Sequence, residues 1–132
     1  MKLGPLFFRI TAIVIFIQLL LGGLLTFNFI SATFHIVTGL IVFILAVATM
    51  IAVLVSKPVF RPLRGLSIGL VALIVIQIIL GLETLRTGSS ALAWFHFLVA
   101  LGIYGMAIAG TFMASQSNRI ANIQTGKPPQ AV

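Results

Sequence analysis

The sequence predicts an all-α fold: an integral membrane four-helix bundle made of two parallel helical-hairpin repeats. Three observations predict it. First, 61% of the 132 residues are hydrophobic and only 7% are charged, whereas a soluble domain carries about 25% charged residues. Second, four apolar segments are long enough to span a bilayer, which takes roughly 20 residues. Third, one short motif recurs in the two halves of the chain.

Short breaks separate the four predicted spans, which are 6–27, 31–55, 63–85 and 91–114. The first break runs from Asn28 to Ser31, Pro58 and Pro62 mark the second, and Gly88 marks the third. Ser89 and Ser90 are alternative caps of the fourth helix. We expect residues 1–115 to form one membrane domain and residues 116–132 to form a polar cytoplasmic tail, with a mobile end over residues 125–129.

Basic residues predict the orientation. Of the eight, only Arg86 lies in the first or third break, and the other seven lie near the termini or the second break; these are Lys2, Arg9, Lys57, Arg61, Arg64, Arg119 and Lys127. Because positive charge favours the cytoplasmic side, both termini are expected in the cytoplasm of a multi-pass cell-membrane protein. The net charge of +7 reflects a single acid rather than a basic cluster, which argues against a nucleic-acid partner.

The repeated motif relates the two halves. Ile17-Gln18-Leu19-Leu20-Leu21-Gly22 resembles Ile76-Gln77-Ile78-Ile79-Leu80-Gly81, and the two glutamines are 59 positions apart. The only histidines, His35 and His96, are 61 positions apart. The difference of two residues falls in or beside the first and third breaks. Each half is therefore predicted to be one helical hairpin, and the two hairpins are parallel repeats.

The two histidines are the leading candidate site. Each lies near the start of the second helix of its hairpin, roughly 6–9 Å below the outer end of that helix at 1.5 Å per residue. They are expected to face each other at one depth and to ligate one haem iron from two sides. Gly39, one turn below His35, and Ala100, one turn below His96, would leave room for the flat macrocycle.

Other interpretations of the histidines remain open. Two unrelated histidines could be satisfied by backbone carbonyl groups or by Gln18 and Gln77, whose recurrence indicates a shared hydrogen bond between helices. A metal ion bound by the protein alone is disfavoured, because no carboxylate lies beside the histidines and the chain has no cysteine. Ionisable groups inside membrane spans are rare and usually functional, which favours a shared role.

Glu83, the only acid, lies three residues before Arg86, so the two side chains can share a helix face. One interpretation is an interfacial ion pair. The other is that Arg86 meets a haem propionate while Glu83 orients it or relays a proton. Tyr104 is expected to pack in the core, and Trp94 is expected at the outer membrane interface.

The four-helix region resembles the haem A synthase family, most specifically in the second hairpin. The resemblance rests on Gln77-Ile78-Ile79-Leu80-Gly81, Gly88-Ser89-Ser90-Ala91-Leu92 and Phe95-His96. It implies a compact, half-length member resembling the haem b-binding half-domain, with His35 and His96 as paired ligands. Three features depart from the family. The catalytic glutamate position is Ala32, the first outer loop has no cysteine pair, and Ile36 replaces an arginine that often follows the histidine.

These observations favour a b-type cytochrome that holds one haem b for electron transfer, with no catalytic residue assigned. One alternative is a haem A synthase-like enzyme that oxidises a haem O methyl group. The other is an accessory subunit of a respiratory or photosynthetic complex, in which the histidines bind haem, chlorophyll magnesium or nothing. The expected partners are membrane lipid, a quinone or membrane redox protein, and a second copy or a larger membrane complex.

Overall fold

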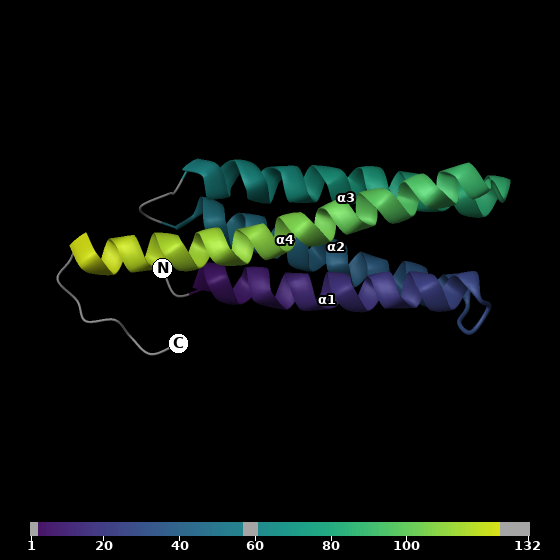
Figure 1. Ribbon diagram of the computed structural model, residues 1–132, viewed down its shortest axis with the longest axis horizontal. Helices are drawn as coiled ribbons and strands as arrows, with labels where there is room; N and C mark the ends of the chain where they lie inside the picture. Colours follow the sequence, from purple (N-terminus) through teal and green to yellow (C-terminus); the bar gives the residue numbers. More distant parts are fainter. Residues whose placement is uncertain (1–2, 57–60, 125–132) are drawn as a thin grey trace.

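Four α-helices form the protein, as the sequence predicts (Figure 1). This computed structural model describes residues 3–56 and 61–124. The helices are α1 (Leu3–Thr26), α2 (Ala32–Leu54), α3 (Arg61–Thr87) and α4 (Ser90–Gln124). Each is long and apolar enough to cross a membrane. The predicted all-α membrane bundle is therefore confirmed.

Capping groups define the two tight connections. The Ser31 side chain accepts a hydrogen bond from the backbone N–H of Phe34 and begins α2. The Ser89 side chain likewise accepts a hydrogen bond from the backbone N–H of Leu92 at the start of α4. Of the two predicted caps, Ser89 and Ser90, the structure therefore has Ser89. Asn28 (φ 61°) and Gly88 (φ 65°) adopt left-handed backbone, which these residue types tolerate best. Both hairpins are therefore closed by local sequence signals.

The fourth helix is longer than the predicted span. It continues from residue 114 to Gln124, so residues 116–124 are helical rather than an irregular tail. The reason is that residues 115–124 are mostly polar but contain no proline or glycine, and these are the residues that end helices. The expected mobile segment at 125–129 and Pro58 lie outside the described residues.

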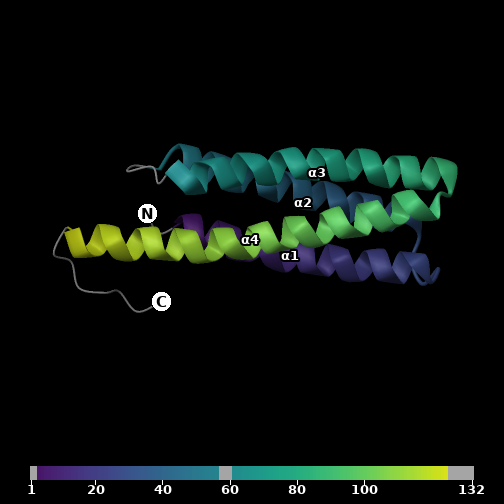
Figure 2. The ribbon, with the colours of Figure 1, turned by 45° about the horizontal axis from the view of Figure 1, so that its top comes forward.

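The helices form a ring in which each packs against two neighbours. The contacts are α1 with α2, α2 with α3, α3 with α4, and α4 with α1. Within the described residues, α1 lies diagonal to α3 and α2 lies diagonal to α4. Figures 1 and 2 show both tight connections at one end, which we call the hairpin end. The start of α1, the end of α2, the start of α3 and the end of α4 lie at the other end, which we call the basic end.

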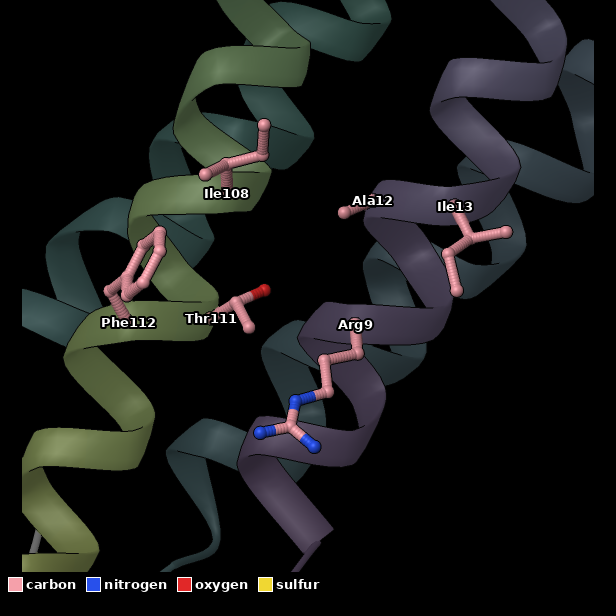
Figure 3. A pocket seen from close by; sticks show the side chains of 6 residues that line it. All are labelled: Arg9, Ala12, Ile13, Ile108, Thr111 and Phe112. Atoms are coloured by element: carbon pink, nitrogen blue, oxygen red, sulfur yellow. The ribbon is translucent and has the colours of Figure 1, made fainter.

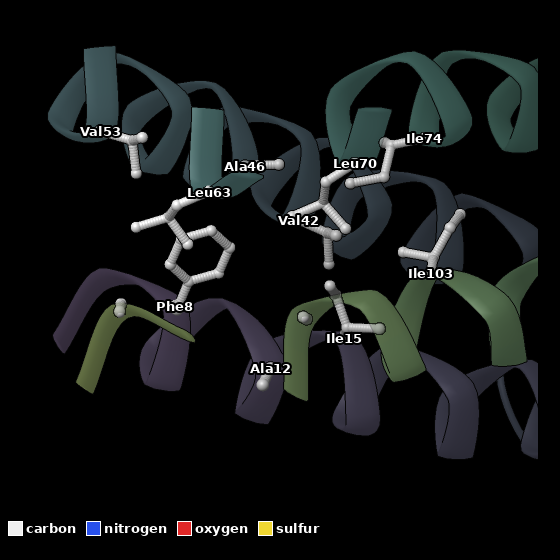
Figure 4. Packing of buried hydrophobic residues seen from close by; sticks show 12 residues of the cluster. Phe8, Ala12, Ile15, Val42, Ala46, Val53, Leu63, Leu70, Ile74 and Ile103 are labelled. Carbon is white, nitrogen blue, oxygen red and sulfur yellow. The ribbon is translucent and has the colours of Figure 1, made fainter. Parts of the chain in front are cut away.

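Among the described residues, the fully buried side chains lie only in the half of the bundle near the basic end, and Figure 4 shows how the hydrophobic ones pack. The buried residues recur with spacings of four, three and four residues, the stripe expected for bundle helices. The stripe is Val42, Ala46, Thr49 and Val53 on α2, Leu63, Ser67, Leu70 and Ile74 on α3, and Ile103, Ala107, Gly110 and Ala114 on α4, with Phe8, Thr11 and Ile15 on α1. No described residue at 16–41 or 75–102 is fully buried.

Two contacts close this half. Phe8 is fully buried, and its ring lies against the backbone of Gly110. Thr11 and Thr49 share a hydrogen bond of 2.8 Å between their hydroxyl oxygens. Polar bonds of this kind join helices where lipid supplies no hydrophobic driving force. The first contact depends on glycine, because a carbon added at Gly110 would overlap the Phe8 ring.

Gly110→Ala should destabilise the bundle by about 1–3 kcal/mol, because a buried ring has no room to move away from an added methyl group. The measurement is the midpoint of thermal unfolding in mild detergent. Gly102→Ala is the matched control on the same helix, since nothing lies within 4 Å of a side-chain carbon at that position. Equal midpoints for the two variants would contradict this packing.

Candidate cofactor site

A cavity of about 760 Å³ occupies the hairpin half of the bundle, and residues of all four helices line it. This volume is within the range of ligand and cofactor sites, about 300–1,000 Å³. The stripe that forms the core at the basic end continues here, but with small or polar residues. They are Gln18 and Gly22 on α1, His35 and Gly39 on α2, Gln77 and Gly81 on α3, and His96 and Ala100 on α4. The glycine and alanine positions among them leave the space open.

The structure brings the two histidines together across this cavity. Their ring centroids are 6.4 Å apart and the ring planes are inclined by 65°. Both side chains are partly buried. They come from α2 and α4, which lie diagonally opposite each other and make no direct helix contact. The two imidazoles therefore approach each other across the centre of the bundle. The repeat predicts this arrangement from the sequence.

One hydrogen bond recurs in each hairpin beside its histidine. The Gln18 side-chain amide donates to the backbone carbonyl of His35 at 2.9 Å. The Gln77 amide donates to the carbonyl of His96 at 2.7 Å. The predicted hydrogen bond between helices is therefore confirmed. It fixes the position of each histidine along the axis of the neighbouring helix.

Two glycines make room for the imidazole rings. A side-chain carbon on Gly81 would lie 2.9 Å from Cε1 of His96, and one on Gly22 would lie 3.4 Å from Cε1 of His35. Sequence reasoning missed this role, although both glycines end the repeated hexapeptide that signals it. Gly39 lines the cavity as expected. Its missing side chain also makes room for the Gln18 amide, which would lie 3.0 Å from a carbon there.

The histidine nitrogens have unequal partners. Nδ1 of His96 lies 3.2 Å from the backbone carbonyl oxygen of Gln77. Because a carbonyl only accepts, Nδ1 carries the proton and Nε2 keeps a free lone pair. The Gln18 amide nitrogen lies 3.3 Å from both ring nitrogens of His35. Both histidines thus have the contacts with a backbone carbonyl or a glutamine that a purely structural role would require. At His96 this contact leaves Nε2 available as a metal ligand.

The two halves also differ at the glutamine oxygens. The Thr38 hydroxyl donates to Oε1 of Gln18 at 2.6 Å. The repeat places Val99 at the position of Thr38. Oε1 of Gln77 is consequently buried with no hydrogen-bond partner among the described residues. A buried unpaired acceptor is costly, so a donor that enters the cavity would be favoured there.

Arg86 lies outside this cavity. It donates two hydrogen bonds to Glu83, from Nε at 2.9 Å and from Nη2 at 2.7 Å, and its side chain is 71% exposed. Neither residue lines the cavity, so the ion-pair interpretation is confirmed, while contact of Arg86 with a propionate stays a prediction. Tyr104 packs on Phe16 at 5.7 Å between ring centroids. Trp94 lines the cavity near the hairpin end, with 66% of its surface exposed.

Gly81→Ala should displace the His96 ring and cost about 1–3 kcal/mol of stability, as overpacking does. Gly22→Ala should be tolerated better, because its added carbon meets His35 at an ordinary contact distance. Gly23→Ala is the control, since nothing lies within 4 Å of that position. In detergent, the thermal midpoint should be highest for Gly23→Ala, lower for Gly22→Ala and lowest for Gly81→Ala. The reverse order would contradict the contacts of Gly22 and Gly81 with the imidazole rings.

Val99→Thr should stabilise the protein by about 0.6 kcal/mol, the mean for hydrogen bonds between membrane helices. The new hydroxyl would donate to Oε1 of Gln77 as Thr38 donates to Gln18. Thr38→Val should have the opposite effect. Val37→Thr, an equivalent change at an exposed position, should leave the thermal midpoint unchanged. Equal thermal midpoints for Val99→Thr and Val37→Thr would show that no hydrogen bond to Oε1 of Gln77 forms.

Comparison with known proteins places the chain in no family: no protein-family model matches it, and neither curated proteins nor solved structures give a significant match.

Proposed function

We propose that the protein is a membrane b-type cytochrome that holds one haem b between His35 and His96 and transfers electrons. The observation that carries the proposal is the meeting of these two rings inside a cofactor-sized cavity. Two axial histidines suit a haem because the macrocycle provides the remaining ligands of the iron. Among the described residues, no group of three His, Cys, Asp or Glu side chains gathers to bind a metal without such help.

The spacing of the rings supports ligation from two sides. Imidazole nitrogens bind metals at about 2.0–2.1 Å, so two rings on opposite sides of one ion would have centroids roughly 6 Å apart. The observed separation is 6.4 Å. The inclination of 65° between the ring planes is compatible with axial ligation, since each ring can rotate about its bond to the metal.

The protein residues around the site would hold and orient the ligands. The Gln77 carbonyl fixes the proton of His96 on Nδ1 and directs Nε2 to the metal, a common outer-shell arrangement. Gly22 and Gly81 allow both rings to approach the neighbouring helices. Apolar residues dominate the rest of the lining. When bound, haem iron supplies one-electron redox chemistry, and its potential depends on this ligation and burial.

Electron transfer is favoured over oxygenase chemistry for two reasons. Two axial histidines leave no open iron position for oxygen. The cavity lining also contains no carboxylate, because Ala32 stands at the position of the family glutamate and Glu83 pairs with Arg86. The resemblance to the haem A synthase family therefore enters the proposal as haem binding without synthase activity.

The location and partners belong to the same proposal. We place the protein in the cell membrane with the basic end in the cytoplasm, following the distribution of Lys and Arg. The haem would then lie near the outer face. A quinone or another membrane protein is the redox partner, since both reach the bundle through the bilayer.

Purified protein expressed with sufficient haem should show the Soret and α bands of a reduced cytochrome b. His35→Ala and His96→Ala should each abolish the normal spectrum, because one axial ligand is lost. Tyr104→Phe, outside the cavity lining, is the control and should retain it. Bands that survive His96→Ala unchanged, or no bands in the parent protein, would overturn the proposal.

A further inference from the structure

Arg9 is a positive charge inside a membrane span. It lies on α1 within the span Gly4–Thr26, about 9 Å from the first helical residue at 1.5 Å per residue. Its side chain is exposed rather than packed in the core. A charged side chain inside a spanning helix is energetically unfavourable, so Arg9 gains by reaching an anion or the membrane interface.

The chain has no carboxylate side chain to meet it. Glu83 is the only acid. It lies near the hairpin end of α3 and already pairs with Arg86. Among the described residues, none forms a hydrogen bond or ion pair with the Arg9 guanidinium. No side chain of the described residues therefore neutralises this group, and an anionic ligand can pair with it.

A groove between α1 and α4 adjoins the guanidinium (Figure 3). Its volume is about 320 Å³, and the residues that line it with Arg9 are Ala12, Ile13, Ile108, Thr111 and Phe112. The Thr111 hydroxyl donates to the carbonyl of Ala107 in its own helix, so the groove wall is effectively apolar. Figure 3 shows the guanidinium directed toward the N-terminal end of α1.

The other half of the repeat lacks the cation. With the spacings of 59 and 61 residues, Ile68 takes the place of Arg9, while Val71 and Met50 replace Ala12 and Thr111. At the remaining wall positions the other half has smaller residues, which are Ala72, Val47 and Ile51 in place of Ile13, Ile108 and Phe112. The charge of Arg9 therefore has no counterpart at the equivalent position of the other half.

We infer that this groove binds one anionic phospholipid, with the phosphate on Arg9 and an acyl chain along Ala12 and Thr111. The neighbouring charges favour an anionic head group over a zwitterionic one. Arg61, Arg64 and Arg119 are exposed at the same end, and basic residues near a membrane surface attract anionic lipids. A lipid bound here would join the first and last helices, which no loop connects. The inference does not depend on haem binding.

The test uses delipidated full-length protein in mild detergent and native mass spectrometry. Phosphatidylglycerol, phosphatidylcholine and inorganic phosphate are titrated separately. We expect one phosphatidylglycerol per chain, weaker retention of phosphatidylcholine and no competition by phosphate at the same concentration. Arg9→Gln should weaken phosphatidylglycerol binding about tenfold or more, because charge-assisted hydrogen bonds are lost.

Three further variants separate lipid binding from folding. Arg9→Lys should restore part of the affinity, because it keeps the charge. The double change Ala12→Val with Thr111→Met copies the other half of the repeat and should weaken binding while Arg9 remains. Arg119→Gln is the control for bulk charge and should bind normally. Helix content by circular dichroism confirms that each variant is folded.

Four results would overturn the inference. They are equal phosphatidylglycerol binding by Arg9→Gln, equal affinity for phosphatidylcholine, full competition by inorganic phosphate, and a protein rather than a lipid retained through Arg9.

Discussion

The structure depends on how the size of the inward-facing side chains changes along each helix. Protein interiors pack as densely as organic crystals, so a stripe of large residues closes a bundle and a stripe of small ones leaves space. Here the stripe closes the basic half because large residues such as Phe8, Leu63 and Leu70 fill the space left by small ones such as Ala107 and Gly110. Toward the hairpin end the same stripe carries Gly22, Gly39, Gly81 and Ala100. The result is one bundle with a packed half and a hollow half.

The hollow half needs another means of holding its helices, and the repeated hydrogen bond supplies it. Each glutamine joins the two helices of one hairpin at the backbone of its histidine. Tight capped turns close both hairpins at that end. The helix spacing is thereby maintained without a core of large side chains. A cofactor that binds both histidines would add the missing contact across the diagonal, between α2 and α4.

Much of this arrangement was predictable from the sequence, and the reasons are specific. Hydropathy located the spans, because lipid requires long apolar helices. The repeat and the short connections placed His35 and His96 on diagonal helices near one end. The rotation of each helix about its axis was not predictable to within one side chain. That is why the roles of Gly22 and Gly81 beside the imidazole rings were missed. The pairing of Gln18 with Thr38, and its absence at Gln77, likewise depend on side-chain positions. The sequence did not predict the extra length of α4, because polar residues mark the end of a membrane span but do not end a helix.

The central claim is that the hollow half is a site for one haem b per chain. Quantitative pyridine haemochrome analysis of the purified full-length protein, combined with its protein concentration, tests this most directly. The account predicts a haem b spectrum and one haem per chain. Absence of haem from protein produced with ample haem supply would contradict it, as would one haem for every two chains, which would place the ligands on different copies.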